Sequence, residues 1–193
     1  MDKEALTTFL LNTNLITLSA AKEIADKFIY KSIPKNQFQL SEGKVSDEYL
    51  LLQKGYMRAF AHDTEGNDIT TGFYTPGQVI FEVASFFNRT RSKENIQALT
   101  DCEGWYITYM QLNALFHAMP QFREFGRSIL VQGFSELKTR MLITITETAE
   151  ARYEHLLKSS PDIFHHAPLK NIATYLGITD TSLIRIRKDF ARK

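Results

Sequence analysis

The sequence predicts an α+β fold: N-terminal helices, an antiparallel β-roll of the jelly-roll type, one long helix, and a C-terminal helix-turn-helix. Three observations lead to this prediction. Short β-type runs separated by turn residues fill the region 28–108. A helical pattern extends from Pro120 to Ile143, and two short amphipathic segments meet at Gly177. At 193 residues the chain can form one large domain or two small ones.

Residues 2–30 have the pattern of two helices. Leu6, Phe9 and Leu10 form one apolar stripe in the first helix. A break over residues 12–18 follows, and Ser19 is the expected N-cap of the second helix.

Five runs in the region 28–108 have the composition of β-strands. Turns that contain glycine, proline or aspartate separate them, among them Gly55, Asp63–Gly66 and Pro76-Gly77. The runs are Glu48–Gln53, Tyr56–His62, Ile69–Phe73, Asn95–Leu99 and Gly104–Thr108. Many short strands at regular turn spacing are typical of a small antiparallel sandwich or barrel.

The long helix begins favourably at Pro120, because the fixed φ of proline suits the first helical position. It contains Gly126 and Gly133, each of which costs ~1 kcal/mol relative to alanine inside a helix. Glycines at this spacing indicate close approach of another element, either a second copy of the helix or the β domain. The residues expected in a dimer contact are Phe122, Gly126, Ile129, Gly133 and Leu137. Thr144 and Glu147 have capping-box spacing and predict the start of a further helix.

The C-terminal segment has the residue pattern of a helix-turn-helix. Ile172 and Leu176 share one face of a first helix, and Leu183 and Ile186 share one face of a second. Gly177 can adopt the positive φ that ends a helix and turns the chain sharply. In this motif the second helix enters the major groove of DNA. The alternative is an ordinary pair of packed helices.

Basic charge is concentrated in the same segment. Residues 168–193 contain six basic and two acidic side chains, a net charge of +4, whereas the whole chain carries +1. Contact with phosphate groups is the functional interpretation of this asymmetry. Complementarity to the helix dipole is the structural one, and the two are compatible.

The composition excludes several classes of protein. A single cysteine, Cys102, excludes an internal disulfide and a multi-cysteine zinc or iron–sulfur site. No signal peptide and no apolar run of membrane length are present, so we expect a cytoplasmic protein without a membrane partner. An enzyme is not expected, because the β region offers His62 as its only histidine and no nucleophile–base pair. No metal site is expected either.

The order of these elements resembles that of the CRP/FNR family of bacterial transcription regulators. The segments Tyr74–Glu82, Thr148–Tyr153 and Ile172–Ile178 carry the resemblance, which covers essentially the whole chain. It implies a cyclic-nucleotide-binding-like β-roll sensor in residues 1–118 and a dimerisation helix in residues 119–145.

The resemblance also implies a helix-turn-helix DNA-binding domain in residues 146–193. The sequence ends five residues after Lys188, so the β-hairpin wing usual in the family is expected to be absent or very short. The implied partners are a second copy of the chain, a near-palindromic site in double-stranded DNA, and RNA polymerase. A ligand-sensing protein-interaction module with a vestigial helix-turn-helix is the alternative function.

The expected effector pocket departs from the cyclic-nucleotide pattern of the family. The glycine–glutamate turn of that pattern reads Phe81-Glu82 here, so a ring stands where the backbone would approach a phosphate. Ser92 replaces the arginine that would pair with the phosphate, and Arg91 is one residue early, which on a strand points it to the opposite face. By gapless counting from Pro120, Leu137 and Lys138 stand where family members carry a hydroxyl pair that binds the adenine amino group. The expected pocket residues are Phe81, Glu82, Val83, Arg91, Ser92 and Lys93.

Several interpretations of the effector therefore stand side by side. They are classical cAMP binding, which Phe81 and Ser92 disfavour, an unknown small molecule, and no effector at all. Glu82 is either a ligand contact or the cap of a short helix. No cofactor is predicted; haem would need histidine ligands. The histidines available are His62, His117, His155, His165 and His166.

The start of the second helix of the motif supplies the expected DNA contacts. Thr179 is its expected N-cap, with Asp180, Thr181 and Ser182 in the first turn. Arg185 is the candidate for a bidentate contact with guanine O6 and N7, worth ~1–3 kcal/mol of discrimination. The full expected set is Lys170, Thr179, Asp180, Thr181, Ser182, Arg185, Arg187 and Lys188.

Overall fold

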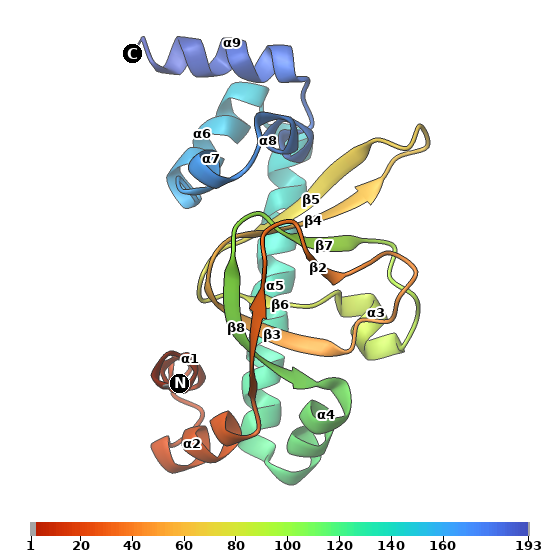
Figure 1. The fold of residues 1–193 in the computed structure, drawn as a ribbon. Coiled ribbons are helices and arrows are strands. Elements are labelled where there is room, and N and C mark those ends of the chain that lie inside the picture. Colours follow the sequence, from red (N-terminus) through yellow and green to blue (C-terminus); the bar gives the residue numbers. More distant parts are fainter. Residues whose placement is uncertain (1–2, 193) are drawn as a thin grey trace.

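The computed structural model describes residues 3–192 (Figure 1). Two N-terminal helices, α1 (Glu4–Leu11) and α2 (Leu18–Asp26), pack against each other. The N-cap of α2 is Thr17 rather than the expected Ser19. Thr17 has an extended backbone and its hydroxyl accepts a hydrogen bond from the Ala20 N–H at 3.4 Å, so the helix begins two residues earlier.

The β-roll consists of two four-stranded antiparallel sheets, in the orders β1-β8-β3-β6 and β2-β7-β4-β5. The strands are β1 (Ile29–Ile33), β2 (Phe38–Leu40), β3 (Glu48–Lys54), β4 (Met57–His62), β5 (Asp68–Tyr74), β6 (Val79–Ile80), β7 (Asn95–Ala98) and β8 (Cys102–Thr108). The five expected runs are β3, β4, β5, β7 and β8. The strands β1, β2 and β6 were not anticipated because they are short and lack a regular alternation of buried and exposed residues.

Strand β3 contributes side chains to two hydrophobic cores, one on each face of its sheet. Leu50 and Leu52 face the space between the two sheets, together with Met57 and Ile96. Tyr49 and Leu51 point to the other side, where α1, α2 and the start of the long helix pack. A strand buried on both faces has a continuous apolar run, which is the pattern of Tyr49–Leu52.

The long helix α5 (Pro120–Thr146) follows α4 (Tyr109–Ala118) and spans the length of the molecule (Figure 1). A further helix does not start at Thr144 as expected. The Thr144 hydroxyl instead donates to the Arg140 carbonyl oxygen within α5 at 2.9 Å, and the next helix is capped by Thr148.

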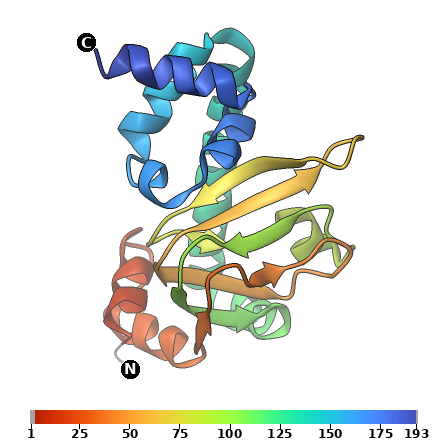
Figure 2. The same ribbon diagram turned by 45° about the horizontal axis from the view of Figure 1, so that its top comes forward.

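Four short helices form a compact C-terminal unit at the far end of α5. They are α6 (Ala149–Ser159), α7 (Ile163–His166), α8 (Leu169–Leu176) and α9 (Asp180–Phe190). Figure 2 shows the β4–β5 hairpin passing directly beneath this unit, and α8 makes extensive contacts with β5. The expected α+β fold, with an antiparallel roll, a long helix and a C-terminal helix-turn-helix, is confirmed.

Candidate nucleic-acid interface and effector region

The turn between α8 and α9 is built on Gly177. Its φ of 67° lies in the left-handed region, as expected for a helix C-cap. The Gly177 N–H donates to the Thr174 carbonyl oxygen at 3.1 Å, and the Ile178 N–H donates to the Ala173 carbonyl oxygen at 3.0 Å. These hydrogen bonds satisfy the last carbonyl groups of α8 and direct the chain into α9.

Helix α9 is oriented by its cap and by its buried face. The Thr179 hydroxyl accepts from the Ser182 N–H at 3.2 Å, which confirms the expected N-cap. Leu183 and Ile186 are fully buried against Ile172, within the core of the C-terminal unit. The opposite face of α9 is left to solvent, and Figure 1 shows the helix at the end of the molecule remote from α2 and α4.

Most of the expected DNA-contact residues are exposed to solvent. The exposed ones are Lys170, Thr179, Asp180, Thr181, Arg185, Arg187 and Lys188. Ser182 is half-buried, and its hydroxyl oxygen accepts from the Thr179 hydroxyl at 3.0 Å, so part of its capacity serves the cap. Thr181, Arg185 and Lys188 lie on one stripe of α9, because they are four and three residues apart.

Ile184 was not among the expected DNA contacts. Its side chain is 57% exposed and it lies three residues from Thr181, beside the stripe that carries Arg185. A large apolar side chain in solvent on a basic helix face is suited to contact with the methyl group of thymine. The signal was present in the sequence, since Ile184 is the one apolar residue of α9 that breaks the buried spacing.

The second region of interest is α3 (Val83–Asn88), which follows β6. Glu82 is its N-cap: the carboxylate accepts from the Ala84 N–H at 3.1 Å and from the Ser85 N–H at 2.6 Å. These are the backbone donors that an anion would use at a helix N-terminus. The capping interpretation of Glu82 is therefore the geometry observed.

Phe81 fills the space beside this cap. Its ring lies 5.1 Å from Tyr49, 5.2 Å from Phe86 and 5.9 Å from Phe87, measured between centroids. Tyr49 and Phe86 are both buried in the core next to β3. Their contacts with Phe81 therefore pack the Phe81-Glu82 turn against this core. Burial raises the pKa of the Tyr49 hydroxyl well above its usual range, so this phenol stays neutral.

The other expected pocket residues do not converge. Ser92 is 3% exposed, and its hydroxyl donates to the carbonyl oxygen of Glu94 at 2.8 Å. Arg91 is exposed and pairs with Val45 in an isolated antiparallel bridge. Val83 and Lys93 are also exposed. Of the six expected residues, Phe81 alone lines a cavity of about 270 Å³ in the roll, whereas Phe81 and Val83 both line a larger cavity of about 870 Å³ beside α5.

Arg89 was not among the expected residues. It holds the C-terminal end of α3 against the loop that contains Ser46 and Asp47. It adopts a left-handed φ of 56° at the helix C-cap. Its guanidinium donates to the Ser46 carbonyl oxygen at 2.9 Å and to Asp47 Oδ1 at 2.5 Å, and it stacks over Tyr109 at 4.3 Å. The Ser46 N–H in turn donates to the buried Ser85 hydroxyl at 2.8 Å. Only the folded structure reveals this fastening, because its partners are far apart in sequence.

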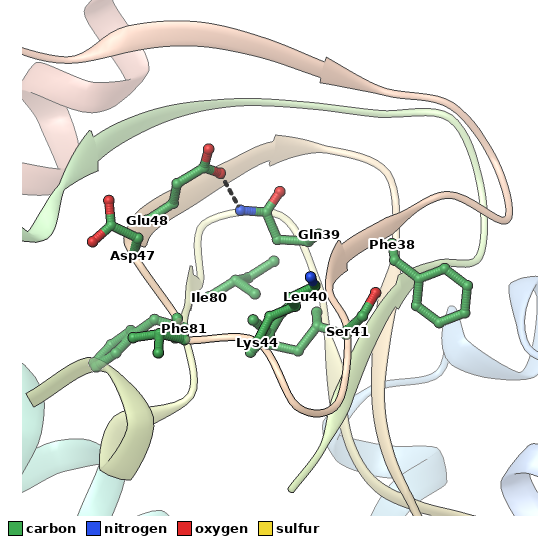
Figure 3. Close-up of a pocket in the computed structure, with 12 residues that line it drawn as sticks. Phe38, Gln39, Leu40, Ser41, Lys44, Asp47, Glu48, Ile80 and Phe81 are labelled. Carbon is green, nitrogen blue, oxygen red and sulfur yellow. Dashed lines mark hydrogen bonds between the residues drawn. The ribbon is translucent and has the colours of Figure 1, made fainter. Parts of the chain in front are cut away.

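The cavity of about 270 Å³ in the roll lies beside Phe81, a member of the aromatic cluster (Figure 3). Its walls are Phe38, Gln39, Leu40, Ser41, Lys44, Val45, Ser46, Asp47, Glu48, Ile80, Phe81 and Ile96. The carboxylate of Glu48 is already engaged by Lys31 and by the amide of Gln39. The cavity is thus bounded by apolar side chains on one side and by polar groups on the other, and among the polar groups Gln39 Oε1 is buried without a hydrogen-bond partner.

These residues do not fit a cyclic nucleotide. The helix N–H groups that would bind its phosphate are occupied by Glu82, and the Phe81 ring stands beside them. The position of the pairing arginine holds the buried Ser92, and Arg89 is committed to Asp47.

The long helix carries an exposed apolar stripe. Phe122 and Gly126 of the expected dimer set lie inside the subunit: Phe122 is 1% exposed, and a Cβ on Gly126 would lie 2.6 Å from Phe116 of α4. Ile129 is half-buried against the same core, whereas Gly133 has nothing within 4 Å of an added Cβ. Large apolar side chains that are exposed further along are Leu130, Val131, Phe134, Leu137, Met141, Leu142 and Ile145.

Two further findings concern residues 3–192. No group of three or more His, Cys, Asp or Glu side chains in this range is arranged to hold a metal ion. Within the same range no helix has both the length and the apolar character needed to cross a membrane.

Comparison with known proteins agrees with this architecture. Residues 30–118 match the family model of the cyclic nucleotide-binding domain. No curated protein sequence matches the chain. Among solved structures, FixK2 from Bradyrhizobium japonicum is similar with a TM-score of 0.74 and 15% identity, over 86% of this chain and 85% of that one.

Two further structures extend the comparison. A regulator assigned to the CRP/FNR family from Eubacterium rectale has a TM-score of 0.71 and 16% identity, over 95% of this chain and 88% of that one. The c-di-GMP-responsive regulator CLP from Xanthomonas campestris has a TM-score of 0.67 and 16% identity, over 86% and 88%. The chain therefore has the fold of the CRP/FNR regulators, with a cyclic nucleotide-binding domain fold as its β-roll.

Proposed function

We propose that this chain is a homodimeric transcription regulator of the CRP/FNR type that binds DNA through α9 and does not respond to cyclic nucleotides. The observation that carries the DNA-binding part is the exposed face of α9. It presents Arg185 and Lys188 on one stripe, while Leu183 and Ile186 hold the helix from behind. A helix supported in this way can enter the major groove without losing its own packing.

The role proposed for each residue in DNA binding follows from the position of its side chain. Arg185 makes the bidentate contact with guanine, and Ile184 contacts a thymine methyl group. Lys170, Arg187 and Lys188 contact phosphates and set affinity rather than sequence. Asp180 in the first turn favours the helix dipole. Double-stranded DNA is the partner, with RNA polymerase as the further partner of a regulator bound there.

Pairing through the second half of α5 makes the regulator a dimer. Leu130, Phe134, Leu137 and Met141 follow one another at spacings of four, three and four residues, the pattern of a coiled-coil seam. Three of them are 43–71% exposed and Leu130 is 38% exposed, so the single subunit leaves the seam unburied. A two-fold dimer would recognise a near-palindromic site with half-sites about 34–36 Å apart.

The effector part of the proposal rests on α3 and the residues that hold its two ends. We call this segment, Glu82–Arg89 with its partner Asp47, the closed cassette. Glu82 satisfies the N-terminal donors of the helix, and Arg89 fastens its other end to Asp47. A regulator of this kind either binds a small molecule other than a cyclic nucleotide or acts without an effector. Its phosphate subsite is occupied by the chain itself.

The experiment is selection of bound sequences from a pool of random double-stranded DNA, carried out with the wild-type protein and with Arg185→Ala. The proposal expects a near-palindromic sequence with the wild type and loss of one conserved position with the variant. Enrichment of no sequence in either selection would contradict it and would favour a protein-interaction module. Size-exclusion chromatography with light scattering tests the dimer independently of DNA.

A further inference from the structure

We propose that Arg58 of β4 is a positioning residue that holds the C-terminal helices in a single pose on the β-roll. This inference rests on the proposed function, because the pose matters for a pair of DNA-reading helices. The Arg58 side chain is 8% exposed, an unusual burial for a guanidinium. A buried charge of this kind is found where its hydrogen bonds fix a particular geometry.

The β-roll fixes most of the guanidinium. Arg58 Nη2 donates to Asp68 Oδ2 at 2.8 Å and to Gln97 Oε1 at 3.1 Å, and Nε also faces Gln97 Oε1 at 3.3 Å. The flat face of the group stacks on Phe60 at 4.0 Å. These contacts come from β4, β5 and β7, so the sheet determines where the remaining nitrogen points.

That remaining nitrogen reaches the C-terminal unit. Arg58 Nη1 donates to Asn171 Oδ1 of α8 at 3.0 Å, across 113 positions of sequence. A guanidinium has donors only, so it requires the amide oxygen of Asn171 on its side and thereby fixes the orientation of that amide. The planar fork of arginine can serve Asp68 and Asn171 at once, which the single ammonium of a lysine cannot do in the same geometry.

Neighbouring residues of α8 complete the docked face. Thr174 is three residues beyond Asn171, and its hydroxyl lies 3.2 Å from both the backbone nitrogen and the hydroxyl of Thr70 on β5. Tyr175 is four residues beyond Asn171 and lies 5.0 Å from Phe73 and 4.1 Å from the Arg140 guanidinium. The three residues share one face of α8.

The docked face is separate from the surface proposed to read DNA. Lys170 is exposed, and the exposed stripe of α9 lies on another helix. Arg58 therefore influences DNA binding through the placement of α8 and α9, without touching the nucleic acid. In a dimer the placement of each unit sets the distance between the two α9 helices, and hence the half-site spacing that fits.

The network around Arg58 also extends towards the cavity in the roll. Asp68 Oδ1 lies 3.4 Å from His62 Nε2, and His62 Nδ1 lies 2.9 Å from Glu42 Oε2. Glu42 belongs to the loop that contributes Ser41 and Lys44 to the cavity wall. The carboxylate that orients Arg58 is thus held on its other side by a residue in contact with this loop.

The test measures the pose directly by pulsed electron paramagnetic resonance. Spin labels at Glu65→Cys on the hairpin tip and Asp189→Cys on α9 report the distance between the roll and the C-terminal unit. Both positions are exposed, whereas the native Cys102 is buried. Labelled protein is mixed with an excess of unlabelled protein, so that each dimer carries one labelled chain.

The inference expects one narrow distance distribution in the otherwise wild-type protein. Arg58→Lys and Asn171→Ala should broaden it, and Asn171→Asp should keep it narrow, because a carboxylate retains the acceptor for Arg58. Lys54→Ala, which removes a surface ion pair with Glu103, is the matched control and should change nothing. Equal narrow distributions in all variants would overturn the inference.

A DNA readout separates positioning from general stability. Asn171→Ala should reduce the preference for the correct half-site spacing by about tenfold, the order expected from loss of one charge-assisted hydrogen bond. Binding to an isolated half-site should stay unchanged. A parallel loss at both sites would overturn the positioning role. The distance measurement needs no DNA, so its outcome stands even if the protein proves not to be a DNA-binding regulator.

Discussion

The backbone N–H of Ser85 donates a 2.6 Å hydrogen bond to the carboxylate of Glu82, the residue that precedes α3. A second hydrogen bond, from the Ala84 N–H at 3.1 Å, reaches the other oxygen of the same carboxylate. The negative charge that a helix N-terminus attracts is therefore supplied by the chain itself. This relationship distinguishes the roll from one that captures a phosphate, and it leads to the first two predictions.

Replacement of Glu82 by alanine should destabilise the protein. Loss of an N-cap side chain costs ~1 kcal/mol, within a range of about 0.5–2 kcal/mol. Urea unfolding measures the change in the free energy of unfolding. Glu65→Ala on the exposed hairpin tip is the control and should have almost no effect. An unchanged stability in Glu82→Ala would contradict the capping role.

Cyclic nucleotides should not stabilise the protein. A ligand present at 100 times its dissociation constant raises the free energy of unfolding by about 2.7 kcal/mol. Thermal unfolding with millimolar cAMP or cGMP should therefore give the same midpoint as unfolding without them. A clear rise in the midpoint would show that Phe81 and Glu82 move aside for the phosphate, against our interpretation of the cassette.

The two glycines of α5 should respond differently to alanine. A Cβ at Gly133 meets nothing within 4 Å, so Gly133→Ala should stabilise the helix by up to ~1 kcal/mol through helix propensity. A Cβ at Gly126 would lie 2.6 Å from the Phe116 ring, which is itself packed on Phe122. Gly126→Ala should gain less than Gly133→Ala or lose stability. Chemical unfolding of the pair at equal protein concentration checks the order, and the reverse order would refute this packing.

A charge in the proposed seam of α5 should separate the subunits. Phe134 is 71% exposed in the single subunit, and Phe134→Asp would place a carboxylate against its counterpart in the dimer. We expect a monomer in light scattering at concentrations at which the wild type is a dimer. Thr139→Asp adds the same charge to another exposed face of the same helix and should leave the dimer intact. Dissociation by both variants, or by neither, would place the interface elsewhere.

Much of the fold could be predicted because its signals are local. Gly177 ends α8 with a positive φ, and Thr179 caps α9, since both roles depend on a few adjacent residues. The same local reasoning was wrong at Thr144 and Ser19. Thr144 has the right residue type for a cap, but its hydroxyl bonds back into an uninterrupted helix. The N-caps observed are Thr17, two residues before Ser19, and Thr148, four residues after Thr144. These two residues set where the helices begin.

The candidate sites could be predicted only in part, because long-range contacts complete them. The sequence pointed to Phe81 and Glu82, and both contribute to the closed cassette. It gave no sign of Arg89, whose role depends on Asp47 from a distant loop, nor of Arg58, whose partner Asn171 lies in another unit. Phe122 looked available for a dimer because its burial against α4 is a tertiary property.

Two substitutions on α9 should separate sequence reading from phosphate contact. Arg185→Ala should cost ~1–3 kcal/mol on the selected site and relax the preference at one base pair. Lys188→Ala should weaken binding to all sequences alike and reduce the salt slope by about one. Titrations at several salt concentrations check both. Equal effects on specific and unrelated DNA in both variants would contradict the assigned roles.

The most direct test of the central claim is fluorescence anisotropy of DNA from the region upstream of the protein's own gene, at two salt concentrations, with and without cAMP. We predict binding that weakens at the higher salt concentration and is indifferent to cAMP, and that Arg185→Ala diminishes. Binding that requires cAMP would contradict the closed cassette. Absence of binding to this DNA and to every sequence from the random pool would contradict the assignment as a DNA-binding regulator.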